Sequence, residues 1–127
     1  MDSKKYLNDS ERTVSADYQA IINRASTKQG VDLIHAALGM QTEVAEFSDM
    51  IRKSLFYGKP LDVVNLKEEI GDALWYMALA LRALNSDFES VMERNIEKLK
   101  ARYPQKFTEE LAENRDLAKE RDILENE

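Results

Sequence analysis

Two pairs of carboxylates are the residues of this chain best suited to chemistry. Glu43 and Glu46 form the first pair, and Glu69 and Asp72 form the second. Within each pair the residues are three positions apart, so on a helix both side chains lie on one face, one turn apart. Asp72 leads into the most apolar stretch of the sequence, residues 73–81. Because a carboxylate beside a buried helix is costly unless it is paired or bound to a metal ion, the two pairs predict a cation site and therefore an enzyme.

The residue types favour a hard divalent cation, Mg²⁺ or Mn²⁺, which binds carboxylate oxygens. Neither pair contains His or Cys, which argues against zinc. A di-iron bundle would require Glu-x-x-His motifs, and the single His35 lies two turns before the first pair. The alternative is that the pairs are solvated surface charge, because Asp and Glu total 24 in this chain.

The spacing of apolar residues predicts the helices that position these pairs. A long helix over about 31–56 carries the first pair, and a helix over about 63–84 carries the second. Gly58 and Pro60 mark a short loop between them, so the two helices are expected to pack antiparallel with the pairs facing each other. The second half of the later helix is apolar nearly all round, so we expect it to be the most buried part of the molecule.

The remaining segments complete an all-α bundle of four to five helices, since no segment alternates with a period of two. We expect Gly30 to break the chain before the long helix, and Thr108 to cap a charged C-terminal helix. The other predicted elements are a loose lead-in over 1–13, helices over 14–25 and 88–103, and the charged C-terminal helix over 109–124, within a tail of 108–127.

Composition narrows the class of protein. The 127 residues are enough for one domain with a core, and 43% of them are hydrophobic. The net charge of −6, without a basic stripe, argues against a nucleic-acid partner. No apolar run reaches membrane-spanning length, the N-terminus lacks an apolar signal core, and the absence of Cys fits a reducing cytoplasm.

With these motifs the chain resembles the MazG-like branch of the all-α nucleoside triphosphate pyrophosphohydrolase superfamily. The family motif, Glu-x-x-Glu followed by Glu-x-x-Asp, is matched by the two pairs, and the segment from Asn95 to Pro104 is also similar. The resemblance covers about residues 31–120, and we interpret 1–127 as a single MazG-like domain of the short form often carried by bacteriophages. It implies Mg²⁺-dependent hydrolysis of a (deoxy)nucleoside triphosphate to the monophosphate and pyrophosphate. It also implies a homo-oligomer, for which we predict a tetramer rather than a dimer.

The same resemblance implies roles for individual residues. Glu43, Glu46, Glu69 and Asp72 become the metal ligands, and Mn²⁺ is expected to substitute for Mg²⁺. Glu46 is the candidate general base.

Five further residues are candidates for substrate binding, although packing or solvent exposure could explain several of them. Lys98 and Arg102, one helical turn apart, could both reach a phosphate tail. Asn95 lies on an apolar stripe, where a buried amide would need a hydrogen-bond partner. His35 could contact the base or sugar, and Gly39 could let a base approach the helix closely.

Two departures from the family pattern leave the substrate open. Family members often carry Lys one turn before each acidic pair, where this chain has Gly39 and Asn65. A purine deoxynucleotide is our choice of substrate. The alternatives are a phosphoribosyl-ATP pyrophosphohydrolase and a non-enzymatic helical oligomer or regulator that binds divalent ions structurally.

Overall fold

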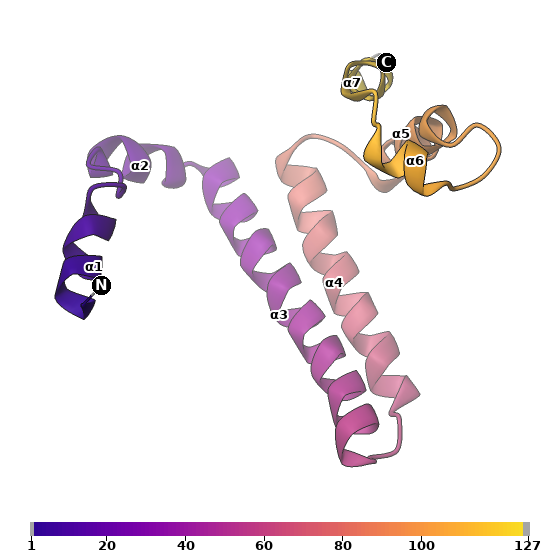
Figure 1. Ribbon diagram of the computed structural model, residues 1–127, viewed down its shortest axis with the longest axis horizontal. Coiled ribbons are helices and arrows are strands. Elements are labelled where there is room, and N and C mark those ends of the chain that lie inside the picture. Colours follow the sequence, from indigo (N-terminus) through magenta and orange to yellow (C-terminus); the bar gives the residue numbers. More distant parts are fainter. Residues whose placement is uncertain (1, 126–127) are drawn as a thin grey trace.

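Residues 2–125, which a computed structural model describes, fold into helices without any strand (Figure 1). The helices are α1 (Ser3–Glu11), α2 (Tyr18–Ala25), α3 (Lys28–Tyr57), α4 (Val63–Ala83), α5 (Phe88–Arg102), α6 (Glu109–Glu113) and α7 (Leu117–Glu125). The predicted all-α fold class is therefore confirmed.

An antiparallel hairpin of α3 and α4 forms the centre of the structure (Figure 1). Thr27 caps α3 by accepting a hydrogen bond from the backbone N–H of Gly30, and Asp62 caps α4 by accepting one from the N–H of Asn65. Gly58 ends α3 in the left-handed conformation, with φ of 63°, which glycine adopts without steric cost. These local signals agree with the two predicted helices and the loop between them.

Gly30 lies inside the first turn of α3, so the prediction that it breaks the chain is wrong. A Cβ atom at this position would lie 2.6 Å from the carbonyl oxygen of Arg24. The glycine therefore allows the end of α2 to approach the start of α3 closely, and the helix break lies before it, at residues 26–27.

The two ends of the chain contain more helix boundaries than the sequence predicted. Residues 3–11 form α1 where a loose lead-in was expected. The predicted helix over 109–124 is divided into α6 and α7, because the Asn114 side chain donates to the Glu110 carbonyl and Asp116 accepts from the Lys119 N–H at 3.0 Å. Residues 1 and 126–127, which the predicted lead-in and tail include, lie outside the described part.

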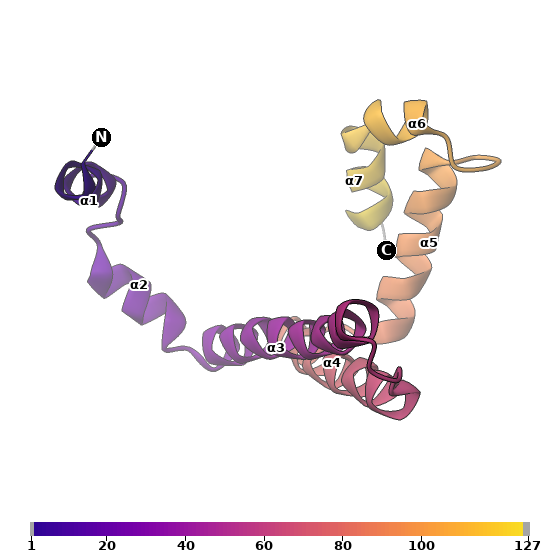
Figure 2. The ribbon, with the colours of Figure 1, turned by 60° about the horizontal axis from the view of Figure 1, so that its bottom comes forward.

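Two arms leave the open end of the hairpin, opposite its loop (Figures 1 and 2). One arm holds α1 and α2, and the other holds α5, α6 and α7, in which α5 packs against α7. The expected bundle is therefore not closed within one chain. Within residues 2–125 no helix is long and apolar enough to span a membrane.

The apolar half of α4 is not the most buried part of the chain, contrary to prediction. Leu74 and Trp75 are each about half exposed, at 47% and 53%. The physical reason is that α3 covers only one face of α4 and no further element of the described chain packs closely on the others. Among the described apolar side chains only that of Ala36, on α3, is fully shielded from solvent.

Candidate metal centre

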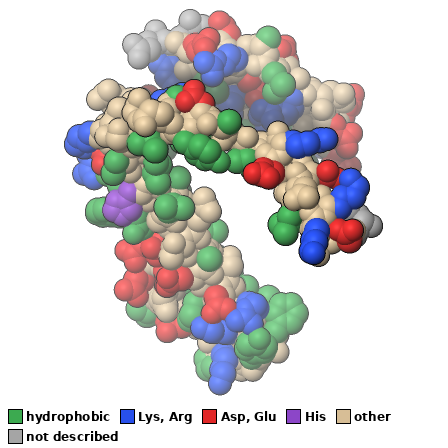
Figure 3. Space-filling model, turned by 90° about the vertical axis from the view of Figure 1, so that its left-hand side faces the viewer, with side chains coloured by type: hydrophobic (Ala, Val, Ile, Leu, Met, Phe, Trp, Pro, Cys, Tyr) green, Lys and Arg blue, Asp and Glu red, His purple; other side chains and the backbone are tan. Residues whose placement is uncertain are grey.

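The hairpin brings together three of the four predicted metal ligands. Glu43 from α3 and Glu69 and Asp72 from α4 each offer a carboxylate oxygen within 4.8 Å of the others. Glu69 is buried, Glu43 is half-buried and Asp72 is exposed. We call these three residues the carboxylate cluster; acidic side chains are seen gathered on this side of the hairpin in Figure 3.

The electrostatics of the cluster are clearest at Glu43. Burial raises the pKa of the Glu43 carboxyl, and the charges of Glu46 and Asp72 and a hydrogen bond with Glu69 raise it further. The cluster thus favours taking up positive charge, either a proton or a cation. Three carboxylates from two rigid helices fit the oxygen-ligand preference of Mg²⁺ and Mn²⁺.

Glu46 lies beside the cluster rather than within it. Its exposed side chain lines a hollow of about 340 Å³ that also borders Asp49, Lys53, Asn65 and Glu69. Glu69 therefore lies between two environments, with the cluster on one side and this hollow on the other.

Asn65 is a residue of this centre whose part the sequence did not predict. Its side-chain Nδ2 donates a hydrogen bond to Oε1 of Glu69, one helical turn later. The sequence pointed to this residue only indirectly, because Asn65 stands at a position where family members often carry Lys.

Aromatic rings flank the cluster on the opposite side from Glu46. A hollow of about 390 Å³ is lined by Glu43, Asp72, Trp75 and Tyr76. His35 is exposed and lies edge-on to both rings, with centroid distances of 6.3 Å to Trp75 and 5.6 Å to Tyr76. Carboxylates and aromatic surfaces thus share one opening, which could hold a ligand with a charged end and a flat end.

Gly39 lies where the two helices of the hairpin pack closely. It is buried, and a Cβ atom added to it would lie 2.1 Å from Cε1 of Tyr76. The Tyr76 ring fills the space next to the glycine, so a base could approach the helix there only if that ring moved. The glycine instead permits close packing of α4 on α3.

The family comparison agrees with this geometry. The family model described as the MazG nucleotide pyrophosphohydrolase domain matches residues 29–107, more than half of the chain. The chain belongs to this family. No curated protein and no solved structure matches the chain.

The matched MazG domain begins in the first turn of α3 and extends past α5, so it contains the whole carboxylate cluster. The resemblance inferred from the sequence is confirmed. Enzymes of the MazG family use divalent metal ions, which agrees with the ligand types of the cluster.

The predicted phosphate-binding residues of the MazG domain lie on α5, in the arm that leaves the hairpin (Figure 2). The structure does not bring Asn95, Lys98 and Arg102 to the carboxylate cluster. Asn95 is exposed, so the prediction that its amide is buried is wrong. No element of the described chain covers that face of α5. Lys98 is half-buried.

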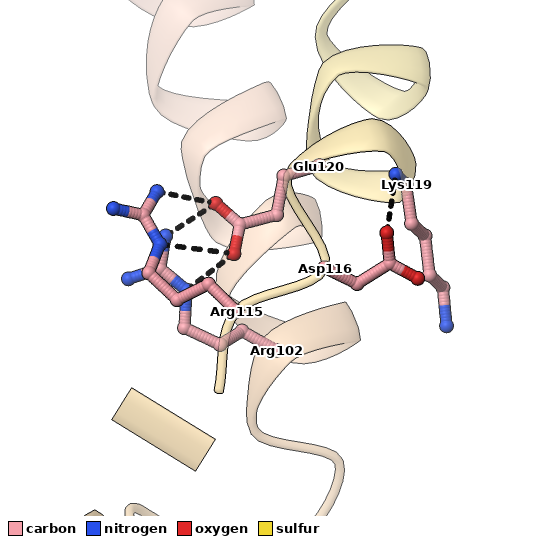
Figure 4. A network of polar contacts seen from close by, with 5 residues as sticks. All are labelled: Arg102, Arg115, Asp116, Lys119 and Glu120. Carbon is pink, nitrogen blue, oxygen red and sulfur yellow. Dashed lines mark hydrogen bonds and ion pairs between the residues drawn. The ribbon is translucent and has the colours of Figure 1, made fainter. Parts of the chain in front are cut away.

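Arg102 is engaged by an internal carboxylate. Its Nε donates to Oε1 of Glu120 at 2.7 Å, and Arg115 donates from Nη2 to the other oxygen at 2.7 Å (Figure 4). These hydrogen bonds lower the pKa of the buried Glu120 to about 2. Glu120 lies beyond the matched MazG residues, so this contact joins the family domain to the C-terminal helix.

Proposed function

We propose that this MazG-family protein hydrolyses nucleoside triphosphates, with a purine deoxynucleotide preferred, to the monophosphate and pyrophosphate. The observation that carries the proposal is the convergence of Glu43, Glu69 and Asp72 beside the hollow lined by Trp75 and Tyr76. A nucleotide has the matching layout, with a charged phosphate end and a flat base.

The carboxylates cannot bind a triphosphate directly, because both are negatively charged. Glu43, Glu69 and Asp72 would hold Mg²⁺, and Mn²⁺ could replace it. When bound, the ion supplies the positive charge that offsets the triphosphate and polarises the reacting phosphate.

Glu46 is our candidate for the general base and a further ligand. Its side chain is exposed, so water can reach it, and its charge acts directly on Glu43. A carboxylate in this position could orient an attacking water and accept its proton.

The nucleoside end would lie along the aromatic side of the opening. Stacking of a base on an aromatic side chain contributes about 1–3 kcal/mol, and a purine offers the larger surface. Trp75 is half exposed and so available for stacking, and His35 is our candidate contact for the base or sugar. Lys98 and Asn95 stay candidates for the substrate, whereas Arg102 would first have to exchange Glu120 for a phosphate.

The direct test is to incubate the protein with each of the eight common NTPs and dNTPs and Mg²⁺, and to separate the products by chromatography. Monophosphate with pyrophosphate is the expected result. Diphosphate with orthophosphate would contradict the proposed cleavage site. Absence of turnover with Mg²⁺ and Mn²⁺ would favour a non-enzymatic role, or an unusual substrate such as phosphoribosyl-ATP, which is assayed separately.

Substitutions connect the activity with the site. Asp72→Asn and Glu46→Gln should lose most turnover while circular dichroism shows an unchanged helix content. Glu68→Gln is the matched control, because Glu68 is an exposed carboxylate of the same helix outside the cluster. Full activity in both site variants would rule out this site.

A further inference from the structure

Glu69 is the buried carboxylate of the carboxylate cluster. It is 7% exposed, it belongs to the carboxylate cluster, and it also borders the hollow next to Glu46. Its orientation therefore decides whether an oxygen points to the shared position between Glu43 and Asp72. A buried carboxylate that is not held would turn to satisfy its own hydrogen bonds.

Asn65 provides that hold. A carboxylate accepts hydrogen bonds, so the amide presents its NH₂ group, and Nδ2 of Asn65 donates to Oε1 of Glu69. Asn65 is itself half-buried and fixed in the first turn of α4, where its backbone N–H donates to Oδ1 of Asp62 at 3.0 Å. The donor thus comes from a rigid helix start rather than from a loop.

We infer that Asn65 is a positioning residue that orients Glu69 for a divalent cation through an uncharged donor. The inference rests on the proposed use of the cluster as a metal centre. The important chemical property of the Asn65 donor is that it carries no charge. A lysine at the same position could also hydrogen-bond Glu69, but its ammonium would offset one of the cluster's three carboxylates and compete with the metal ion.

Substitutions of Asn65 separate the effect of the donor from the effect of charge. Asn65→Leu keeps the branched shape and the number of side-chain heavy atoms but removes the donor, and should weaken metal binding about 10- to 100-fold, the usual effect of losing a group that orients a ligand. Asn65→Gln keeps an amide donor and should restore most of the affinity. Asn65→Lys restores a donor but adds a charge, so its affinity should stay below that of Asn65→Gln, with a difference that narrows at high salt.

None of these changes removes the cap of α4. The cap uses the Asp62 side chain and the Asn65 backbone N–H, which every one of these residues retains. The Leu variant is therefore expected to fold, and the Gln and Lys variants give the same comparison with a polar side chain.

The experiment is a titration of the full chain with Mn²⁺ alone, followed by electron paramagnetic resonance of the free ion, without nucleotide. Wild type, the three Asn65 variants and Asp72→Asn are compared, with Asn8→Leu on α1 as the control for the same chemical change at an exposed position. The expected order of affinity is wild type, Gln, Lys and then Leu, with the control equal to wild type.

Two results would overturn the inference and are distinguishable. Wild-type Mn²⁺ affinity in Asn65→Leu, together with lost affinity in Asp72→Asn, would remove the positioning role and leave the metal centre in place. Wild-type affinity in Asp72→Asn would show that the cluster is not the metal site, and the proposed function would fail with the inference.

Discussion

Among single residues, Glu43 responds most directly to what the centre binds. Its pKa is raised by burial first and then by the neighbouring carboxylates, so the proton and a metal ion compete for it. Below the raised pKa the carboxyl is protonated and metal binding is weakened, and above it the carboxylate is free to bind.

We therefore expect Mn²⁺ affinity to fall as the pH is lowered through the Glu43 pKa. Glu43→Gln should bind more weakly at neutral pH and lose this part of the pH dependence, because glutamine does not titrate. A Mn²⁺ titration of wild type and of Glu43→Gln over a pH series measures this pH dependence. An identical pH dependence in the two proteins would contradict the assignment.

The stability of the metal-free protein changes with pH in the opposite direction to its metal affinity. A raised carboxyl pKa means that the metal-free folded state takes up its proton at a higher pH than the unfolded chain does. Protonation of Glu43 should therefore stabilise the metal-free protein as the pH falls through the raised pKa. The metal-loaded protein should instead lose stability over the same pH range, because protonation of Glu43 weakens metal binding.

At the scale of elements, the packing of α4 on α3 depends on the absence of a side chain at Gly39. A Cβ atom there would meet Tyr76 at 2.1 Å, whereas one at Gly71 would meet nothing within 4 Å. Both glycines lie inside helices, so the pair separates packing from helix propensity.

Gly39→Ala should lower the free energy of unfolding by about 1–3 kcal/mol, because the Tyr76 ring must move. Gly71→Ala should raise it by about 0.5–1 kcal/mol, because alanine is the better helix former. Urea denaturation followed by circular dichroism measures both. Equal changes in the two variants would show that the close contact is unimportant.

The C-terminal helix is attached to α5 through the ion pair of Glu120 with Arg102, and Arg115, between α6 and α7, pairs with the same carboxylate. Because the pKa of Glu120 is lowered from its usual 4.5 to about 2, its charged form stabilises the folded state at any pH above 4.5. That contribution declines as the pH falls from 4.5 towards 2.

Glu120→Gln should therefore melt at a lower temperature than wild type at pH 7, with a difference that shrinks between pH 4.5 and 2. Proteolysis should cut α7 of the variant faster while α3 and α4 stay protected. Glu125→Gln is the control, since Glu125 forms an exposed pair with Arg121. A melting difference that is the same at pH 7 and pH 2.5 would contradict the account.

α3, α4 and α5 could be predicted because their ends carry local signals, such as Gly58 and the capping residue Asp87. Three ligands could be placed together because the loop fixes how the two helices meet. The contact between Arg102 and Glu120 could not be predicted, because it joins residues 18 positions apart through a break that the pattern did not show.

Burial was the other property that the pattern could not supply. Apolar periodicity predicts which face of a helix avoids water, but it does not say whether the same chain covers that face. Asn95 was therefore placed on an apolar stripe of its helix, and yet it is exposed in the single chain.

At the scale of the whole molecule, α3 and α4 expose apolar faces, and we propose that a second copy of this chain covers them. A groove on the hairpin is lined by Val44, Phe47, Ile70 and Ala73 together with Glu43 and Glu69. Exposed apolar surface of this extent is unusual for a monomer. Covering the groove would also exclude water from one side of the carboxylate cluster.

We expect a homotetramer in solution, built from such pairs. Equilibrium sedimentation at micromolar concentration should give about four times the 14.6 kDa of one chain. Ile70→Glu, which places a charge in the groove, should shift the protein towards smaller species, whereas Val14→Glu, in the exposed segment before α2, should not. A mass of one chain for wild type would contradict the prediction.

If a second copy covers the apolar faces as proposed, the hairpin and the assembly form in a definite order during folding. Contacts between α3 and α4 are close in sequence and require little loop closure, so the hairpin can form rapidly within each chain. Pairing of hairpins is bimolecular, and its rate depends on how often chains meet. Newly made protein at low abundance would thus remain as open hairpins, with its carboxylates assembled early and its apolar faces covered late.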